Sequence, residues 1–217
     1  MIKLVIFDLD GTLINAYPAV EKSVNHTLKS MGLRKRGFDT IRRSVGWGDS
    51  HLLKGFVGES RLKVALSIYR PHHAQALKKG TRLLPGAKKV LIQLKKRGIL
   101  LSVASNRPTR FSLIALNYLK IRKYFDYILC ADKVKKGKPS ADIFFRILKR
   151  FQLKPAQALY VGDMTIDVMA GKKANIRTVA VLTGSCSRKE IAKWLHARII
   201  KNISLLPKAF ESLNSQK

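Results

Sequence analysis

The residues of this sequence that are best suited to chemistry are its acids, which are scarce. The chain has 217 residues, with 43 Lys+Arg against 13 Asp+Glu. Four of the acids fall in two short clusters: Asp8, Asp10, Asp163 and Asp167. Asp8 and Asp10 end an apolar run, and two residues apart in an extended chain their side chains point to the same side. Gly11 then permits a tight turn, and Thr12 adds a hydroxyl and an amide donor beside the acids.

Other polar side chains follow apolar segments later in the sequence, and parallel strands would bring them to one edge of a sheet. They are Ser105, Asn106, Lys138, Asp163 and Asp167. Two carboxylates ~4 Å apart repel each other by about 4 kcal/mol at an effective dielectric constant of roughly 20, so a group of three needs cations. Mg²⁺ prefers oxygen ligands and often binds substrate phosphate, and Lys138 can supply further positive charge. The pattern therefore suits a phosphate-bearing substrate.

The segments that would position these residues alternate between strand-like and helical patterns. The strand-like segments are residues 2–7, 99–104, 127–131, 158–161, 178–182 and 198–203. Strands that alternate with helices imply right-handed crossovers and a parallel sheet with helices on both faces. We therefore predict an α/β fold, a doubly wound parallel sheet that forms a Rossmann-like core.

Residues 15–82 differ from the rest of the chain because they are mostly helical in pattern and contain no convincing strand of a parallel sheet. Apolar residues recur at helical spacing from Val20 onward, and Gly32 is a plausible end of the first helix. We therefore predict an inserted, mostly helical cap domain at 15–82, within a core formed by residues 1–14 and 83–217.

Bulk composition sets limits on partners and location. The net charge of +30 is compatible with nucleic acid as a partner, but the basic residues are spread along the whole chain, so we favour diffuse surface charge. Cys130 and Cys186 form neither a disulfide framework nor a metal-ligand spacing. Neither a membrane span nor a signal peptide is recognisable, so we expect a cytoplasmic protein without a membrane partner. The histidines show no ligand spacing and are expected at the surface or in packing: His26, His51, His72, His73 and His196.

The motifs together resemble those of the haloacid dehalogenase-like hydrolase superfamily, and within it the sequence looks like enzymes of the phosphoglycolate phosphatase type. All four motifs of the superfamily occur in order, and the resemblance covers essentially the whole chain. They are residues 8–12 (Asp-Leu-Asp-Gly-Thr), Ser105, Lys138 and residues 162–167 (Gly-Asp-Met-Thr-Ile-Asp). The resemblance implies a Mg²⁺-dependent phosphatase that hydrolyses a small phosphomonoester, such as phosphoglycolate, through an aspartyl-phosphate.

The resemblance also implies a role for each catalytic and phosphate-binding residue. Asp8 would be the nucleophile that takes up the phosphoryl group, and Asp10 would act as general acid and then as general base. Ser105 and Asn106 would bind the phosphoryl group. Lys138 would orient Asp8 and screen the phosphoryl oxygens.

A magnesium site is implied by the same resemblance. Its ligands would be Asp8, Asp163 and the backbone carbonyl of Asp10, with Asp167 supporting the site from close by. The superfamily places a mobile cap between its first and second motifs, where residues 15–82 lie. Closure of such a cap would exclude water from the site.

Alternative functions remain open at this point. A pyrophosphatase, nucleotidase or sugar-phosphate mutase of the same superfamily is possible, and so is a basic nucleic-acid-binding protein on this fold. Asp10 argues against a haloacid dehalogenase, which lacks this second acid, and Thr12 disfavours the mutases.

Trp47 and Asp49 are candidates for substrate contacts from the cap. Arg107 replaces a lysine that is common in relatives, which we interpret as a conservative change outside the main chemistry. The expected partner is a small phosphorylated metabolite, bound by a monomer or homodimer.

Overall fold

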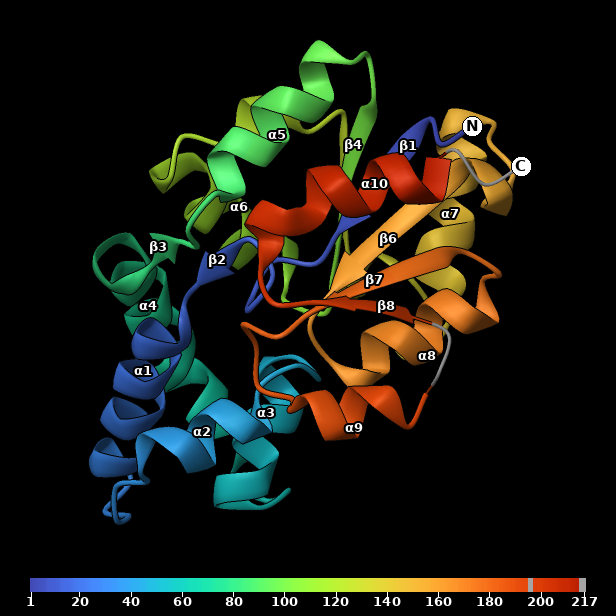
Figure 1. Ribbon diagram of the computed structural model, residues 1–217. Coiled ribbons are helices and arrows are strands. Elements are labelled where there is room, and N and C mark those ends of the chain that lie inside the picture. Colours follow the sequence, from blue (N-terminus) through green and yellow to red (C-terminus); the bar gives the residue numbers. More distant parts are fainter. Residues whose placement is uncertain (195–196, 215–217) are drawn as a thin grey trace.

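The computed structural model describes residues 1–194 and 197–214, and its centre is a six-stranded parallel sheet (Figure 1). The strands are β1 (Leu4–Phe7), β4 (Leu100–Ser105), β5 (Tyr127–Cys130), β6 (Ala158–Gly162), β7 (Arg177–Val181) and β8 (Ala197–Ile200). Their order across the sheet is β5-β4-β1-β6-β7-β8, and every neighbouring pair runs parallel. All the core strands predicted from the sequence are therefore present.

Helices cover both faces of the sheet (Figure 1). One face packs against α5 (Ala87–Lys96), α6 (Thr109–Tyr118) and α10 (Leu206–Asn214). The other packs against α7 (Asp142–Phe151) and α8 (Thr165–Lys173), with α9 (Arg188–Ala192) next to α8. Val5 and Phe7 of β1 join the first layer, and Leu4 and Ile6 join the second. This burial on both faces explains the continuous apolar run of β1, and the doubly wound α/β fold is confirmed.

The section between β1 and β4 is mostly helical, as predicted. Its helices are α1 (Tyr17–Ser30), α2 (Phe38–Ser44), α3 (Asp49–Val57) and α4 (Leu62–Gly80). They share a hydrophobic cluster of their own, with Val20, Leu53 and Tyr69 among its buried members. Where the chain leaves and re-enters the core, β2 (Ile14–Asn15) and β3 (Arg82–Leu83) form a short antiparallel pair, which we did not predict. The inserted section (residues 15–82) thus has its own core and a narrow base.

The histidines are packing residues where the structure shows their contacts. The rings of His26 and His72 stack with their centroids 4.1 Å apart, and His73 stacks on Tyr69 at 4.7 Å. The ring of His51 lies beside the indole of Trp47, with the centroids 5.6 Å apart, whereas His196 falls outside the described residues. Among the helices that are described, none is long and apolar enough to cross a membrane.

The connections of the sheet change direction next to β1. The chain that leaves β1 returns as β4 on one side, whereas the chain that leaves β6 returns as β7 on the other side. A crevice therefore opens between the carboxyl ends of β1 and β6, and doubly wound sheets bind their ligands in such a crevice. Asp8 directly follows β1 and Asp163 directly follows β6, so both acid clusters of the sequence begin at this crevice.

Candidate active site

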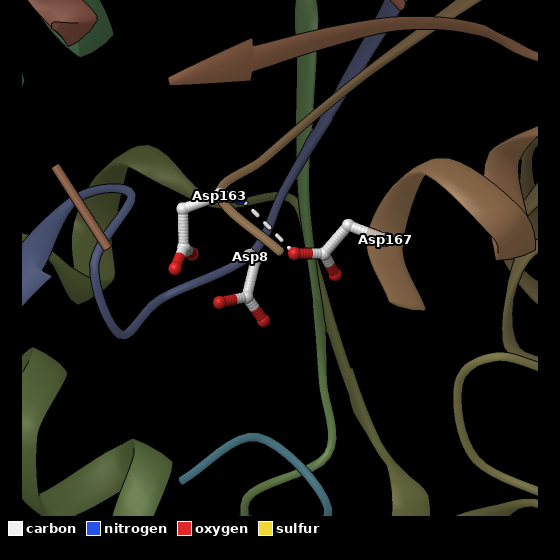
Figure 2. Close-up of side chains that lie close together, drawn as sticks. All are labelled: Asp8, Asp163 and Asp167. Atoms are coloured by element: carbon white, nitrogen blue, oxygen red, sulfur yellow. Dashed lines mark hydrogen bonds between the residues drawn. The ribbon is translucent and has the colours of Figure 1, made fainter. Parts of the chain in front are cut away.

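The acids that follow β1 and β6 meet in one place, together with an acid from the first turn of α8 (Figure 2). Carboxylate oxygens of Asp8, Asp163 and Asp167 lie within 4.8 Å of one another, and all three residues are buried. The backbone N–H of Asp8 donates to the carbonyl of Val161 at 2.8 Å, which extends the pairing of β1 and β6 to the site itself. The two acid clusters, far apart in the sequence, are therefore adjacent in the fold.

Lys138 brings positive charge to this group from the loop between β5 and α7. Its Nζ donates to Oδ1 of Asp8 and Oδ1 of Asp167, both at 2.7 Å, and to the hydroxyl of Tyr160 at 2.9 Å. Burial by itself lowers the pKa of Lys138, but the carboxylates of Asp167 and Asp8 outweigh it, so the net shift is upward. Lys138 is thus a buried ammonium group whose three N–H donors are all engaged.

Asp167 holds several parts of the site together. Its Oδ1 accepts hydrogen bonds from Lys138 and from the hydroxyl of Tyr160, the latter at 2.6 Å. Its Oδ2 accepts from the backbone N–H groups of Asp163 and Met164, at 3.0 and 2.9 Å (the bond to Asp163 is dashed in Figure 2). Because each carboxylate oxygen already has two donors, Asp167 has little capacity left for a cation. Its contacts are those of a residue that positions Lys138 and the turn after β6.

Asp163 lacks such compensation. Its Oδ1 accepts a hydrogen bond from the hydroxyl of Thr12 at 2.9 Å, whereas its buried Oδ2 has no hydrogen-bond partner in the described part of the chain. Burial raises the pKa of Asp163 well above its ordinary value, and the carboxylates of Asp167 and Asp8 add to the shift. A buried carboxylate oxygen without a donor is unfavourable as an anion unless a cation binds it.

Asp8 shows the same deficit of positive charge. Burial raises the pKa of Asp8 from 3.8 to about 7, although the ammonium of Lys138 opposes the shift. A further cation beside this carboxylate would favour its ionised form. Hard divalent cations prefer oxygen ligands, and the carboxylates of Asp8 and Asp163 offer them. The residues present therefore fit a divalent metal ion.

Two glycines leave the room that this arrangement needs. At Gly11, which has a φ of +82°, an added Cβ would lie 2.5 Å from Oδ2 of Asp163. At Gly184, in the loop after β7, an added Cβ would lie 1.6 Å from the same oxygen. The sequence already indicates the importance of Gly11, because a tight turn is expected after Asp10. Gly184 belongs to no motif, and its role is visible only in the folded chain.

Asp10 has a partner that sequence reasoning missed. Nη2 of Arg107 donates to Oδ1 of Asp10 at 2.6 Å, and the exposed fractions of the two side chains are 7% and 12%. Arg107, which we expected outside the main chemistry, therefore lies in direct contact with one of the acids singled out in the sequence. Strand β4 pairs directly with β1, so the residues that follow β4 lie beside those that follow β1. The available signal was the position of Arg107 two residues after Ser105.

Ser105 and Asn106 differ in their surroundings, although both come from the end of β4. Ser105 lines a cavity at the site, and its Oγ accepts the N–H of Arg107 at 3.2 Å. Nδ2 of Asn106 donates to the carbonyls of Gly46 and Lys138, at 2.9 and 2.8 Å. Oδ1 of Asn106 accepts the backbone N–H of Lys138 at 2.8 Å. The Asn106 amide therefore connects the Lys138 loop to the inserted section, which leaves it little capacity to bind a phosphoryl group.

A cavity of about 60 Å³ lies between the core and the inserted section. The polar residues on the core side of the cavity are Asp8, Asp10, Ser105, Arg107, Lys138 and Asp167. The opposite wall is mostly apolar and includes Leu52 and Tyr69. His73 also lines it, and burial lowers the pKa of His73 well below its ordinary value, with the charge of Arg107 adding to the shift. Asp49 reaches the cavity, whereas Trp47 is 46% exposed and lines an outer groove.

Known proteins share this sequence pattern. Residues 5–181 match the family described as haloacid dehalogenase-like hydrolase. The chain belongs to that family. A curated phosphoglycolate phosphatase from Pseudomonas fluorescens Pf-5 is 30% identical over 219 residues, which covers 96% of this chain and 80% of the relative. A second, from Aquifex aeolicus, is 31% identical over 182 residues, which covers 84% of this chain and 85% of the relative.

Solved structures agree on the fold. The crystal structure of a predicted phosphoglycolate phosphatase from Haemophilus somnus 129pt matches with a TM-score of 0.90 and 27% identity. The match covers 96% of this chain and 98% of that one. Together, the family and the curated relatives identify the protein as a phosphoric monoester hydrolase.

Proposed function

We propose that the protein is a Mg²⁺-dependent phosphatase that hydrolyses a small phosphomonoester, with phosphoglycolate as the leading substrate, through an aspartyl-phosphate on Asp8. One observation carries the proposal. Asp8 and Asp163 are buried side by side, Lys138 lies 2.7 Å from Asp8, and no described residue donates to Oδ2 of Asp163. Burial of charges without full compensation costs stability, so such a cluster is a candidate for a catalytic centre.

The first chemical step is assigned to Asp8. Its carboxylate would attack the phosphorus atom, so that a bond from Asp8 to phosphorus forms while the bond from phosphorus to the ester oxygen breaks. Lys138 holds the carboxylate in place, and its charge offsets the negative charge on the phosphoryl oxygens. Ser105 lines the cavity and would donate its hydroxyl to the phosphoryl group. The role that we propose for Asn106 is to position Lys138.

The proton transfers are assigned to Asp10. As an acid, Asp10 would protonate the departing alkoxide. As a carboxylate, it would then accept a proton from the water molecule that attacks the aspartyl-phosphate, which releases inorganic phosphate and restores Asp8. Both steps require that the Asp10 side chain keep one orientation, and the hydrogen bond from Arg107 at 2.6 Å provides it.

The metal ion would be held by Asp8, Asp163 and the backbone carbonyl of Asp10, with Asp167 supporting the site through Lys138 and the turn after β6. An all-oxygen ligand set suits Mg²⁺ better than softer metals. When bound, the ion supplies positive charge that neutralises the phosphoryl oxygens and keeps the carboxylates ionised. The unpartnered oxygen of Asp163 is the feature of this chain that most directly supports the assignment.

The size of the cavity supports a small substrate. At about 60 Å³ the cavity is far smaller than the ~300–1,000 Å³ typical of sites for drug-sized ligands, which favours a short leaving group over a nucleotide. The curated relatives named above are phosphoglycolate phosphatases, which places phosphoglycolate first among the substrates to test.

We also propose that residues 15–82 act as a cap over a core formed by residues 1–14 and 83–217. The hydrophobic cluster of this section and its narrow two-stranded base support a separate unit. The hydrogen bond from Asn106 to the carbonyl of Gly46 joins cap and core when the cavity is closed. Closure would exclude water, and opening would let substrate and product exchange.

The proposal is tested by phosphate release from a panel of compounds. The panel contains 2-phosphoglycolate, p-nitrophenyl phosphate, pyrophosphate and a nucleoside monophosphate, each with Mg²⁺ or with EDTA. We expect Mg²⁺-dependent turnover that is fastest for small monoesters, and a loss of at least about a thousandfold in Asp8→Asn. The matched control is Asp39→Asn on the exposed surface of α2, which should keep full activity. Undiminished turnover in Asp8→Asn, or in EDTA, would refute the mechanism.

A further inference from the structure

Arg107 is a buried cation that is only partly satisfied by its surroundings. Its Nη2 donates to Asp10, but its buried Nη1 has no hydrogen-bond partner among the residues that the structure describes. A guanidinium N–H that is removed from water without an acceptor costs free energy. Arg107 lines the same cavity as the proposed nucleophile Asp8. The fold therefore keeps an unsatisfied cationic donor at the wall of the substrate cavity.

The ammonium group of Lys138, the other positive charge at the cavity, already donates all its hydrogen bonds to protein groups. Of the described residues that line the cavity, Lys138 and Arg107 carry a cationic side chain, and His73 is kept neutral by burial. The three N–H donors of Lys138 point to Asp8, Asp167 and Tyr160. Arg107 is thus the lining cation with a donor to offer to a ligand.

We propose that Arg107 recognises a carboxylate on the leaving group, which makes the enzyme selective for phosphate esters of short hydroxy acids. The inference rests on the proposed function, because it takes Asp10 as the acid that reaches the ester oxygen. Arg107 is hydrogen-bonded to Asp10, so its guanidinium lies on the leaving-group side of the reaction. In the phosphate ester of a two-carbon hydroxy acid, the carboxylate is bonded to the carbon that bears the ester oxygen. One guanidinium can therefore serve Asp10 with Nη2 and the substrate carboxylate with Nη1.

The arrangement also explains how a phosphate ester that lacks a carboxylate would be rejected. An ester without the carboxylate would leave Nη1 buried and unpaired, and sites built to hydrogen-bond a polar group discriminate strongly against analogues that lack it. In the described structure no residue of the opposite wall, Tyr69 and Asp49 included, accepts a hydrogen bond from Nη1 of Arg107. The preference for esters that carry a carboxylate over esters that lack one should therefore depend on Arg107.

The test compares two substrates of nearly equal shape, 2-phosphoglycolate and its carboxamide analogue, in the full-length enzyme with Mg²⁺. We expect Arg107→Gln to lower kcat/KM for 2-phosphoglycolate by at least about a hundredfold, mainly through KM, and for the amide by no more than about tenfold. Arg107→Lys keeps the charge and should recover part of the loss. The matched control is Arg110→Gln, at an exposed position on α6, which should leave both substrates unchanged within about twofold.

A binding measurement separates recognition from turnover. Calorimetric titration of Asp8→Asn with 2-phosphoglycolate should show an affinity that falls by at least about tenfold when Arg107→Gln is added. Equal losses for both substrates, carried by kcat, would mean that Arg107 serves Asp10 or the phosphoryl group alone, and would overturn the inference. A wild-type enzyme that hydrolyses the amide as well as the acid would overturn it too, while phosphatase function would stand. Absence of turnover on every phosphomonoester would instead refute the proposed function.

Discussion

Substitution of Gly184 by alanine tests the geometry of the proposed metal site most directly. The backbone of Gly184 has an ordinary φ, and a glycine-to-alanine change at such a loop position normally stabilises a protein by about 0.4–1 kcal/mol. Here the new Cβ would lie 1.6 Å from Oδ2 and 2.3 Å from Cγ of Asp163. Because carbon and oxygen atoms cannot approach so closely, the Asp163 carboxylate must move by more than about 1 Å.

The expected magnitude follows from what Asp163 loses. Its hydrogen bond with Thr12, at 2.9 Å, would break and leave buried polar atoms unsatisfied, which costs about 1–3 kcal/mol. With the backbone gain subtracted, we expect the free energy of unfolding to fall by about 1–2 kcal/mol. If Asp163 is the metal ligand that we propose, its displacement by about 1 Å should cost roughly a hundredfold in Mg²⁺ affinity and in kcat/KM.

Urea denaturation, calorimetric titration with Mg²⁺ and phosphate release measure these three quantities separately. The matched control is Gly55→Ala in helix α3, where an added Cβ meets no atom of the described chain within 4 Å. That variant should be as stable as the wild type or up to about 1 kcal/mol more stable, with unchanged turnover. If Gly184→Ala keeps Mg²⁺ affinity and kcat/KM within about twofold, the position that we assign to the Asp163 carboxylate is wrong.

Two further predictions concern the contacts around the cavity. Asn106→Ala removes three hydrogen bonds, which hold the loop of Lys138 and join it to Gly46 in the proposed cap. We therefore expect the free energy of unfolding to fall by about 2–3 kcal/mol and kcat/KM to fall by roughly a hundredfold. The control variant Asn117→Ala, at an exposed position, should leave both quantities unchanged. His73 has its pKa lowered by burial, so below pH 6.5 the unfolded chain takes up a proton that the folded chain does not. Stability should therefore decrease as the pH falls, with a slope of at most about 1.4 kcal/mol per pH unit for one proton. Urea midpoints at several pH values should show a smaller decrease in His73→Gln than in the control His51→Gln, and equal slopes would contradict this account.

Sequence patterns alone were sufficient for the architecture of the core. A strand buried on both faces must be apolar throughout, which made β1 recognisable, and the alternation of such strands with helices determined the parallel sheet. The position of Asp8 and Asp10 after β1, and of Asp163 after β6, followed because polar residues end an apolar run abruptly. These features depend on residues close together in the chain, and local periodicity reports them.

The contacts that make the site specific were decided by tertiary structure. Arg107 meets Asp10 because β4 pairs with β1, and Gly184 packs against Asp163 because the loop after β7 crosses the end of β6. The amide of Asn106 is hydrogen-bonded to two loops, through Gly46 and Lys138, and the residue type alone does not reveal these partners. Strand order and loop paths arise from the packing of the whole chain, so no local pattern encodes them. The sequence therefore determined which residues reach the crevice, and the fold decided which of them touch.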